Sequence, residues 1–230
     1  NKLGLVILSG IIGNFIPAYL FCIAETKIDS ALAGILNSLT PLFTIIVGML
    51  VFKISIDSKK IGGIFLGLVG LCISVVAGKT LHFENISFSI FIILATICYG
   101  FNVNMVGKHM QNISAINIAS LAFSFSIIPG MIILYMTGYF SNDFTNPALL
   151  NATLASGTLG VINTSIASIL FYVLVKRAGI LFASTVTYAI PFVSLAMGLL
   201  YNEAIHPMRL LGLAIILCGV YIVNKRSTAK

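Results

Sequence analysis

The sequence has very few charged residues. Only 8% of its 230 residues are charged, with 13 Lys and Arg against 6 Asp and Glu, whereas a soluble domain typically carries about 25%. Hydrophobic residues make up 59% of the chain. So few charges cannot cover the surface of a soluble globular protein. A chain with so many apolar residues is also not expected to be intrinsically disordered. The composition therefore excludes both classes and indicates an integral membrane protein.

Signatures of other protein classes are also lacking. The four cysteines lie inside apolar runs without metal-ligand spacing, and the basic residues occur singly or in pairs between such runs. The first pattern argues against a metal site, and the second favours membrane topology over nucleic-acid binding. There is no HExxH motif, no buried Asp pair and no Ser–His or Cys–His set at depth. We therefore expect neither an enzyme nor a bound cofactor.

Eight apolar runs are long enough to cross a membrane as helices. They cover residues 3–24, 30–52, 61–78, 87–107, 114–137, 149–175, 180–201 and 208–224, and a spanning helix needs about 20 mostly apolar residues. Barrel strands would instead alternate polar and apolar residues. The predicted fold is all-α, a polytopic membrane helix bundle with eight transmembrane helices.

The basic residues predict the orientation of these helices. Eight helices place both termini on one side, together with ten basic residues, while the other side has three, Lys27, Lys79 and Arg209. The ten are Lys2, Lys53, Lys59, Lys60, Lys108, Lys176, Arg177, Lys225, Arg226 and Lys230. Short loops rich in Lys and Arg remain in the cytoplasm. Both termini are therefore predicted to be cytoplasmic, and the 138–148 segment external.

An internal repeat appears when the chain is shifted by 150 residues without a gap. The shift superposes the first three predicted helices on the last three. The coinciding residues include Pro41 and Pro191, Gly10 and Gly160, Gly48 and Gly198, and Gly62 and Gly212. Apolar matches are common by chance in this composition, but proline and glycine matches within helices are not. The match therefore indicates a repeat.

The repeat predicts two inverted halves. Residues 1–80 would hold the last three helices of a first repeat, and residues 87–226 a complete second repeat of five helices. Because five is odd, the copies insert with opposite orientation, as in secondary transporters whose substrate site lies near the midplane between the halves. The first two helices of repeat one have no counterpart in this sequence. We therefore expect an N-terminally truncated part of a ten-helix carrier, which transports poorly or not at all by itself.

Two blocks that each join a proline-containing helix, a polar turn and a glycine-rich helix support a family resemblance. They are ALAGILNSLTPLFTIIVGMLVFKISIDSKKIGGIFLGLVG (31–70) and FASTVTYAIPFVSLAMGLLYNEAIHPMRLLGLAIILCG (182–219). ATICYGFNVNMVGKH (95–109) is similar to the opening helix of the family's second repeat. With these motifs the chain resembles the EamA-type branch of the drug/metabolite transporter superfamily over nearly its whole length. The family's acidic residue after the proline helix matches Glu203, whereas the first-repeat equivalent is Lys53.

The two repeated prolines indicate where a substrate site would lie. Pro41 and Pro191 each free the backbone carbonyl four residues earlier, which belongs to Asn37 or Thr187. An unpaired carbonyl is costly in hydrocarbon, so it faces protein or a wet cavity. We favour a cavity at the repeat interface. The alternative is a packing kink in which neighbouring hydroxyls satisfy the carbonyls.

Polar residues at helical spacing complete this candidate cavity. Asn and Tyr at mid-span are costly to bury, which favours cavity lining over the alternative, interhelical packing. The predicted cavity residues are Asn14, Asn37, Thr40, Pro41, Tyr99, Asn102, Asn163, Ser168, Tyr172, Thr187, Tyr188 and Pro191. The small residues Gly63, Gly67, Gly70 and Ser74 instead predict close helix packing and are excluded from the site.

The predicted cavity is neutral. No Asp, Glu, Lys or Arg lies in the central turns of any predicted span, whereas a phosphate would require Arg or Lys at depth and a drug cation a carboxylate. We therefore expect a secondary transporter or facilitator that moves small polar or zwitterionic, amino-acid-like metabolites across the cytoplasmic membrane by alternating access. The bacterial inner membrane is the expected location. The alternative is a truncated, non-transporting membrane remnant or scaffold.

The expected partners follow from this prediction. They are a small-molecule substrate and the lipid bilayer, with no nucleic acid and no metal, and a homodimer is left open.

Overall fold

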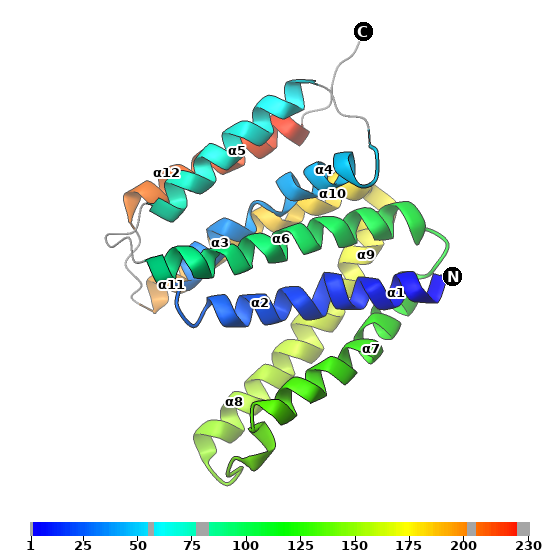
Figure 1. The fold of residues 1–230 in the computed structure, drawn as a ribbon, viewed down its shortest axis with the longest axis vertical. Coiled ribbons are helices and arrows are strands. Elements are labelled where there is room, and N and C mark those ends of the chain that lie inside the picture. Colours follow the sequence, from blue (N-terminus) through cyan, green and yellow to red (C-terminus); the bar gives the residue numbers. More distant parts are fainter. Residues whose placement is uncertain (1, 55–57, 77–82, 202–205, 225–230) are drawn as a thin grey trace.

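The fold was analysed in a computed structural model that describes residues 2–54, 58–76, 83–201 and 206–224. The described residues form helices joined by short turns, without strands (Figure 1). The elements are α1 (Lys2–Gly10), η1 (Ile11–Phe15), α2 (Ile16–Ala24), α3 (Ser30–Asn37), α4 (Thr40–Leu50), α5 (Ser58–Val76), α6 (Phe83–His109), α7 (Ala115–Met136), η2 (Tyr139–Ser141), α8 (Pro147–Thr158), η3 (Leu159–Ile166), α9 (Ala167–Ala178), α10 (Ile180–Thr185), η4 (Val186–Tyr188), α11 (Ala189–Leu200) and α12 (Pro207–Asn224). The predicted all-α class is confirmed.

Five helical stretches among the described residues are long and apolar enough to cross a membrane. They are Lys2–Ala24, Ser30–Leu50, Ser87–His109, Ala115–Met136 and Pro147–Ala178. Two further apolar stretches, Gly62–Ser74 and Pro207–Ile222, are shorter. The remaining predicted span, residues 180–201, is divided into α10, η4 and α11. Five of the eight predicted spans therefore meet the criterion, and the count of eight stays a prediction.

Both proline-containing helices are interrupted. α3 ends at Asn37 and α4 begins at Thr40, and the 3₁₀ turn η4 separates α10 from α11 in the second half. Pro41 lies in the first turn of α4, where a missing N–H is tolerated. The Asn37 carbonyl that it leaves free accepts a hydrogen bond from Thr40 Oγ1 at 2.8 Å. A neighbouring hydroxyl therefore satisfies the Asn37 carbonyl, as expected for the alternative of a packing kink.

Two π-helical segments also occur at matching positions. η1 covers residues 11–15, and a shift of 150 residues places it on 161–165, inside η3. π-bulges are rare and frequently occur at functional sites. In the first segment Gly13 packs directly against the Asn102 side chain, because a Cβ at Gly13 would collide with that amide. The absence of a side chain at Gly13 therefore lets α6 place a polar group against the π-turn.

The helices α5 and α12 pack closely in antiparallel orientation. A Cβ added to Gly70 would lie 2.7 Å from the Gly212 carbonyl oxygen, and one added to Gly219 would lie 2.6 Å from the Gly63 carbonyl oxygen. Small residues let helix backbones approach in this way. The predicted packing role of the glycine stripe is confirmed.

The interrupted helices cross each other. α3 packs against α11, and α4 packs against α10, so the first part of each helix contacts the second part of the other. This pattern requires an antiparallel crossing near the two interruptions.

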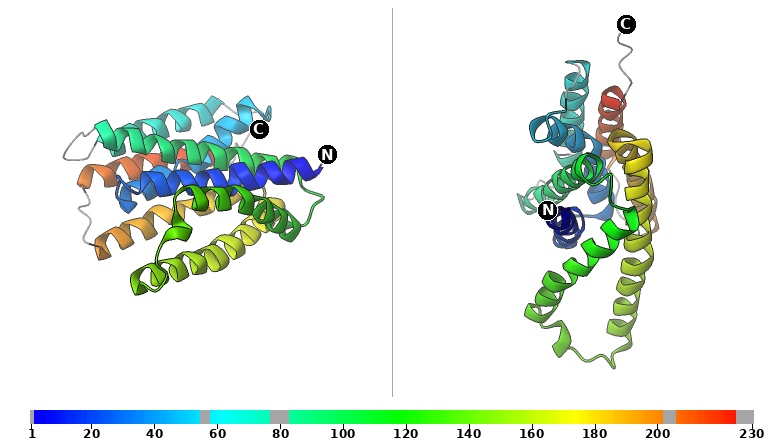
Figure 2. Two further views of the ribbon diagram at one scale, coloured as in Figure 1. Left: turned by 60° about the horizontal axis from the view of Figure 1, so that its bottom comes forward. Right: turned by 90° about the vertical axis from the view of Figure 1, so that its right-hand side faces the viewer.

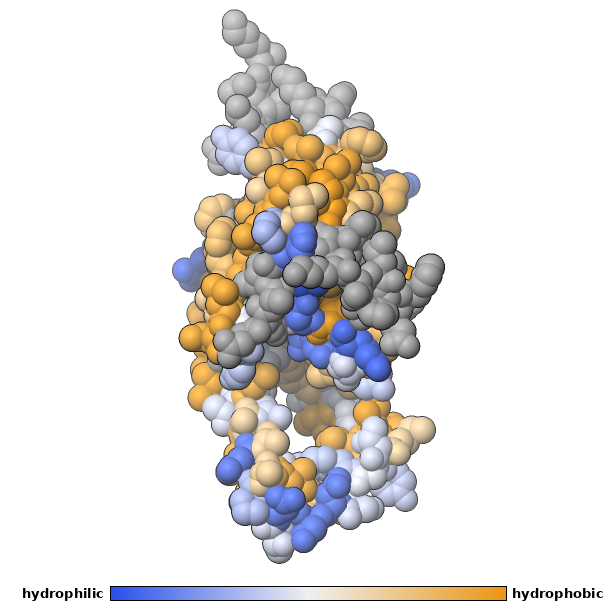
Figure 3. Space-filling model, turned by 90° about the vertical axis from the view of Figure 1, so that its left-hand side faces the viewer, coloured by the Kyte–Doolittle hydropathy of each residue, from blue (hydrophilic) through white to orange (hydrophobic). Residues whose placement is uncertain are grey.

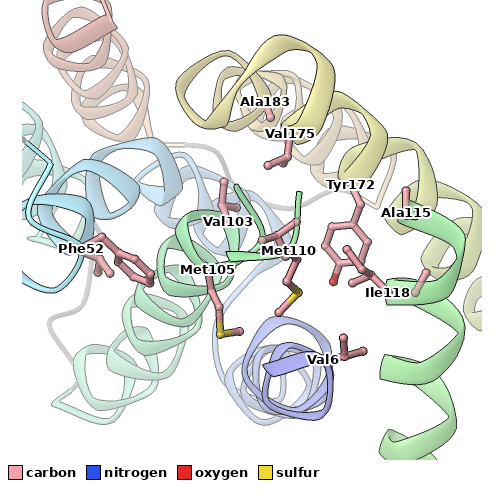
Figure 4. Close-up of a cluster of buried hydrophobic side chains, with 13 residues drawn as sticks. Val6, Phe52, Val103, Met105, Met110, Ala115, Ile118, Tyr172, Val175 and Ala183 are labelled. Carbon is pink, nitrogen blue, oxygen red and sulfur yellow. The ribbon is translucent and has the colours of Figure 1, made fainter. Parts of the chain in front are cut away.

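One end of the bundle is closed by a large apolar cluster (Figure 4). Its buried residues are Val6, Val47, Phe52, Val103, Met105, Val106, Met110, Ala115, Ile118, Ala119, Tyr172, Val175 and Ala183. They come from α1, α4, α6, α7, α9 and α10 and from the turns that follow α4 and α6. This end also has Lys53, Lys108 and Lys176, and is therefore the predicted cytoplasmic end.

The α7–α8 hairpin is less closely packed than the body of the bundle. α7 buries Ala115, Ile118, Ala119 and Ala122 in its first half, whereas Tyr135 and Met136 near its other end are each 79% exposed. The α7–α8 hairpin diverges from the other helices (Figures 1 and 2). Figure 3 shows the molecule hollowed between the body of the bundle and the polar tip of this hairpin. The bundle is therefore open along the hairpin, whereas Ala24, Ile28, Leu32 and Ile92 form a further buried cluster near the turn between α2 and α3.

Candidate functional site

Five polar side chains form a hydrogen-bonded network inside the bundle. Asn14 Nδ2 donates to Tyr172 OH at 3.1 Å, and Asn102 Nδ2 donates to the same oxygen at 3.3 Å. Ser9 Oγ donates to Asn102 Oδ1 at 2.6 Å, and Ser168 Oγ lies 3.5 Å from Asn14 Oδ1. We call these five residues the Tyr172 network. It joins α1 and η1 to α6 and α9, helices that are distant in the sequence.

The network is enclosed on one side and accessible on the other. Ser9, Asn102 and Tyr172 are buried, with Tyr172 only 2% exposed. Asn14 and Ser168 are half-buried. A small molecule would therefore reach the network first through Asn14 and Ser168, with the Tyr172 hydroxyl behind them.

The chemistry of the network is polar and neutral. Its groups are two amides, two aliphatic hydroxyls and one phenol, which together offer both donors and acceptors. Within the described residues, no group of three or more His, Cys, Asp or Glu side chains could hold a metal ion. The arrangement is suited to binding a small polar molecule by hydrogen bonds.

A second group of polar residues lies between α4 and α6. Asn104 Nδ2 donates to the carbonyl oxygens of Thr44 at 2.7 Å and Gly100 at 2.8 Å. Thr40 Oγ1 also lies 3.2 Å from Asn37 Oδ1. Asn37, Thr40 and Asn104 are all buried. These contacts are local or join two neighbouring helices, so they fix the packing of α4 on α6.

The structure brings together four of the twelve predicted cavity residues. Asn14, Asn102, Ser168 and Tyr172 belong to one network, whereas Asn37 and Thr40 bond to each other. Tyr99 stacks at a tilt on Phe21, with ring centroids 6.4 Å apart. Thr187 Oγ1 donates to the Ser184 carbonyl oxygen at 2.7 Å. Pro41 is buried at the start of α4.

Three predicted cavity residues have side chains outside the described part. They are Asn163, Tyr188 and Pro191, of which only the backbone is described. Of the charged residues used above, Lys79, Glu203, Lys225, Arg226 and Lys230 also lie outside the described residues.

The prediction missed Ser9 and Asn104. Ser9 lies one helical turn before Gly13, on the helix that also contains Asn14, and this spacing is the only sequence signal for it. A single serine in an apolar helix is more often interhelical packing than a ligand group. Asn104 follows Asn102 by two residues and so lies on a different face of α6, which explains its separate role.

The charged side chains near the helix ends bind backbone or one another. Lys108 Nζ donates to the Phe52 carbonyl oxygen at 2.8 Å, and Lys176 Nζ lies 3.4 Å from the Gln111 carbonyl oxygen. At the opposite end, Arg209 Nη1 and Asp29 Oδ2 form an ion pair of 2.6 Å. These contacts tie helix ends together, and among the described residues no hydrogen bond of the Tyr172 network involves a charged side chain.

Comparisons with known proteins identify the class. The model of the EamA-like transporter family matches residues 1–76 and 86–225. No curated protein matches the chain. A solved structure titled "Crystal structure of protein" is similar, with a TM-score of 0.63 and 16% sequence identity, and the match covers 95% of this chain and 76% of that chain. At this identity the likeness shows the fold alone.

The fold, the apolar helices and the family match together define a multi-pass membrane transporter of the drug/metabolite type. The chain belongs to the EamA-like transporter family, whose members are transporters rather than enzymes.

Proposed function

We propose that this protein moves small polar or zwitterionic metabolites, such as neutral amino acids, across the cytoplasmic membrane by alternating access. The observation that supports this most strongly is the Tyr172 network, in which Asn14 and Ser9 bond to Asn102 and Tyr172. The first two residues belong to the first predicted repeat and the last two to the second. A substrate bound here would contact both halves, as alternating access requires.

The matching irregularities of the two halves support an inverted repeat. The π-segments and the interrupted helices lie about 150 positions apart in the sequence, and α5 and α12, which pair in antiparallel orientation, are equivalent helices under the same shift. Irregular backbone at membrane depth is tolerated where it is buried in protein or lines a cavity. Two such segments in corresponding helices are expected where a transporter binds its substrate.

The neutral chemistry of the network supports the substrate class. Amides and hydroxyls can bind both the carboxylate and the ammonium group of a zwitterion, because they supply donors and acceptors without net charge. A phosphate would leave its charge uncompensated next to Tyr172, and so would a cation. A neutral zwitterion therefore fits this network better than either ion.

The orientation is part of the proposal. The end of the bundle that is closed by the apolar cluster has Lys53, Lys108, Lys176 and Arg177. By the positive-inside rule this end faces the cytoplasm, and both termini lie on the same side. The bacterial inner membrane is the proposed location.

The test is uptake by proteoliposomes that contain the purified protein, and it also tests the expectation from the sequence that this chain transports poorly by itself. Saturable uptake of at least one radiolabelled neutral amino acid is expected, and Tyr172→Phe should lower it about tenfold, because the buried Asn102 amide and the half-buried Asn14 amide lose their acceptor. Tyr139→Phe is the matched control. It removes the hydroxyl that lies 2.7 Å from Thr153 Oγ1 in the α7–α8 hairpin, away from the network, and should leave uptake unchanged. Uptake of phosphorylated or cationic compounds without any amino acid would overturn the proposed substrate class.

A further inference from the structure

The Tyr172 hydroxyl has an unused hydrogen-bond donor. Its oxygen accepts from Asn14 Nδ2 at 3.1 Å and from Asn102 Nδ2 at 3.3 Å, so its acceptor capacity is filled while its proton is not yet accounted for. Among the described residues, no hydrogen bond uses this proton. Figure 4 shows the ring within the apolar cluster and the hydroxyl pointing away from α9. Because buried polar groups are normally hydrogen-bonded, the phenol proton requires an acceptor from outside the network.

The two amides next to this hydroxyl add further donors. An Asn side chain has two N–H groups, and Asn14 and Asn102 each use one of them in the bond to Tyr172. The Asn102 Oδ1 atom already accepts from Ser9 Oγ at 2.6 Å. The inner part of the network, around Tyr172 and Asn102, therefore offers more donors than acceptors. Such a site is suited to an anionic group, because hydrogen bonds to an ionised acceptor are short and strong.

The half-buried side of the network has the opposite character. Asn14 and Ser168 lie there, and the described hydrogen bond between Ser168 Oγ and Asn14 Oδ1 is long, at 3.5 Å. Both oxygens have lone pairs that can accept from a ligand. A cationic donor such as an ammonium group therefore fits this side. The donors and acceptors of the network are thus separated in space, with the donors deeper in the bundle.

We propose that the Tyr172 network binds an amino acid with its carboxylate innermost and its ammonium group toward Ser168. This proposal rests on the function proposed above and assigns each charged group of the substrate to one part of the site. The carboxylate accepts from the Tyr172 O–H and from an unused N–H of the neighbouring amides, and the ammonium group donates to Asn14 Oδ1 and Ser168 Oγ. Asn14 contacts both ends of the substrate, because its amide nitrogen and oxygen are attached to the same carbon atom.

The test is competition for binding to the purified protein in detergent micelles, which does not require transport. Radiolabelled alanine, leucine and phenylalanine are the probes. Each is displaced by its own deaminated acid and by its own decarboxylated amine, which for alanine are propionate and ethylamine. The acid should compete at least about tenfold better than the amine, because buried donors reject a ligand that lacks their acceptor. An amine that competes as well as the acid, while the amino acid itself binds, would overturn this orientation and leave the proposed function intact.

Two substitutions distinguish the two ends of the site. Tyr172→Phe keeps the ring but removes the phenol proton, so it should weaken binding of the amino acid and of the acid about tenfold and binding of the amine less. Ser168→Ala should weaken binding of the amino acid and of the amine about two- to threefold and leave the acid unchanged. Tyr139→Phe, in the α7–α8 hairpin, is the matched control and should change none of the three.

The remaining outcomes separate this proposal from the one on which it rests. An equal loss for all three ligands in Tyr172→Phe would show that Tyr172 only supports the fold, and would overturn its contact with the carboxylate. A loss of acid binding in Ser168→Ala would overturn the place of the ammonium group. Binding of none of the three amino acids would overturn the proposed substrate class, and this orientation with it.

Discussion

The helices α3–α4 and α10–α11 occupy equivalent repeat positions in very different surroundings. In Ser30–Leu50, 83% of the apolar window is buried, and α3 is buried from Ala31 to Asn37. In α11, by contrast, Phe192 is 60% exposed and Val193 is 62% exposed. Both helices are nevertheless interrupted just before or at the turn that contains their proline. The interruption therefore depends on the local sequence. The surrounding helices determine how much a substitution at each position lowers the free energy of unfolding.

The largest difference between equivalent positions is expected at Gly212 and Gly62. Gly212→Leu should lower the free energy of unfolding by at least about 3 kcal/mol, because its side chain would meet the Ser74 hydroxyl and the Gly70 backbone. Gly62→Leu is the control, since no atom lies within 4 Å of a Cβ there. Titration with sodium dodecyl sulfate, followed by circular dichroism, measures both. Equal stability of the two variants would contradict the close contact of α5 with α12.

A smaller difference is expected at Leu36 and Val186. Leu36 is 0% exposed, whereas Val186 is 51% exposed. Leu36→Ala should cost about 2–3 kcal/mol, because the cavity left behind loses van der Waals contacts. Val186→Ala should cost under about 0.5 kcal/mol. The same denaturation experiment compares them, and a larger loss at Val186 would reverse the burial difference between the two halves.

The smallest difference concerns the interruption itself, at Thr40 and Ile190. Thr40→Val keeps the shape of the side chain but leaves the buried Asn37 carbonyl without its hydroxyl partner, which should cost about 1–2 kcal/mol. Ile190 is 39% exposed, and Ile190→Val should be neutral within about 0.5 kcal/mol. If Thr40→Val is also neutral, the hydroxyl does not satisfy the carbonyl, and the cavity-lining alternative gains support.

The sequence predicted the features that depend on composition and local chemistry. The all-α membrane fold followed from the apolar runs, and the packing of α5 followed from its glycine spacing. Pro41 correctly marked a helix irregularity, but a proline alone does not show whether Thr40 or water satisfies the freed carbonyl. The rotamer of Thr40 decides this, and it depends on packing that a single sequence does not display.

The candidate site was predictable only in part. Asn14, Asn102 and Tyr172 were recognised because Asn and Tyr are costly in lipid. The π-turn at η1 has no sequence signature, so the contact between Gly13 and Asn102 was not foreseen. Nor was the pairing of Asn104 with Thr44, which depends on how α6 sits on α4. Residues that act across helices are found only when the helices are placed.

The contact between Gly13 and Asn102 also limits how this protein could be re-engineered. Any side chain at residue 13 would displace the Asn102 amide, and Asn102 in turn bonds to Ser9 and Tyr172. The inner part of the network is therefore a unit in which single substitutions damage several contacts at once. Asn14 and Ser168 are half-buried, and neither forms a described hydrogen bond with Ser9 or Asn102. Directed evolution of substrate selectivity should begin at these two positions, where variants can keep the inner unit intact.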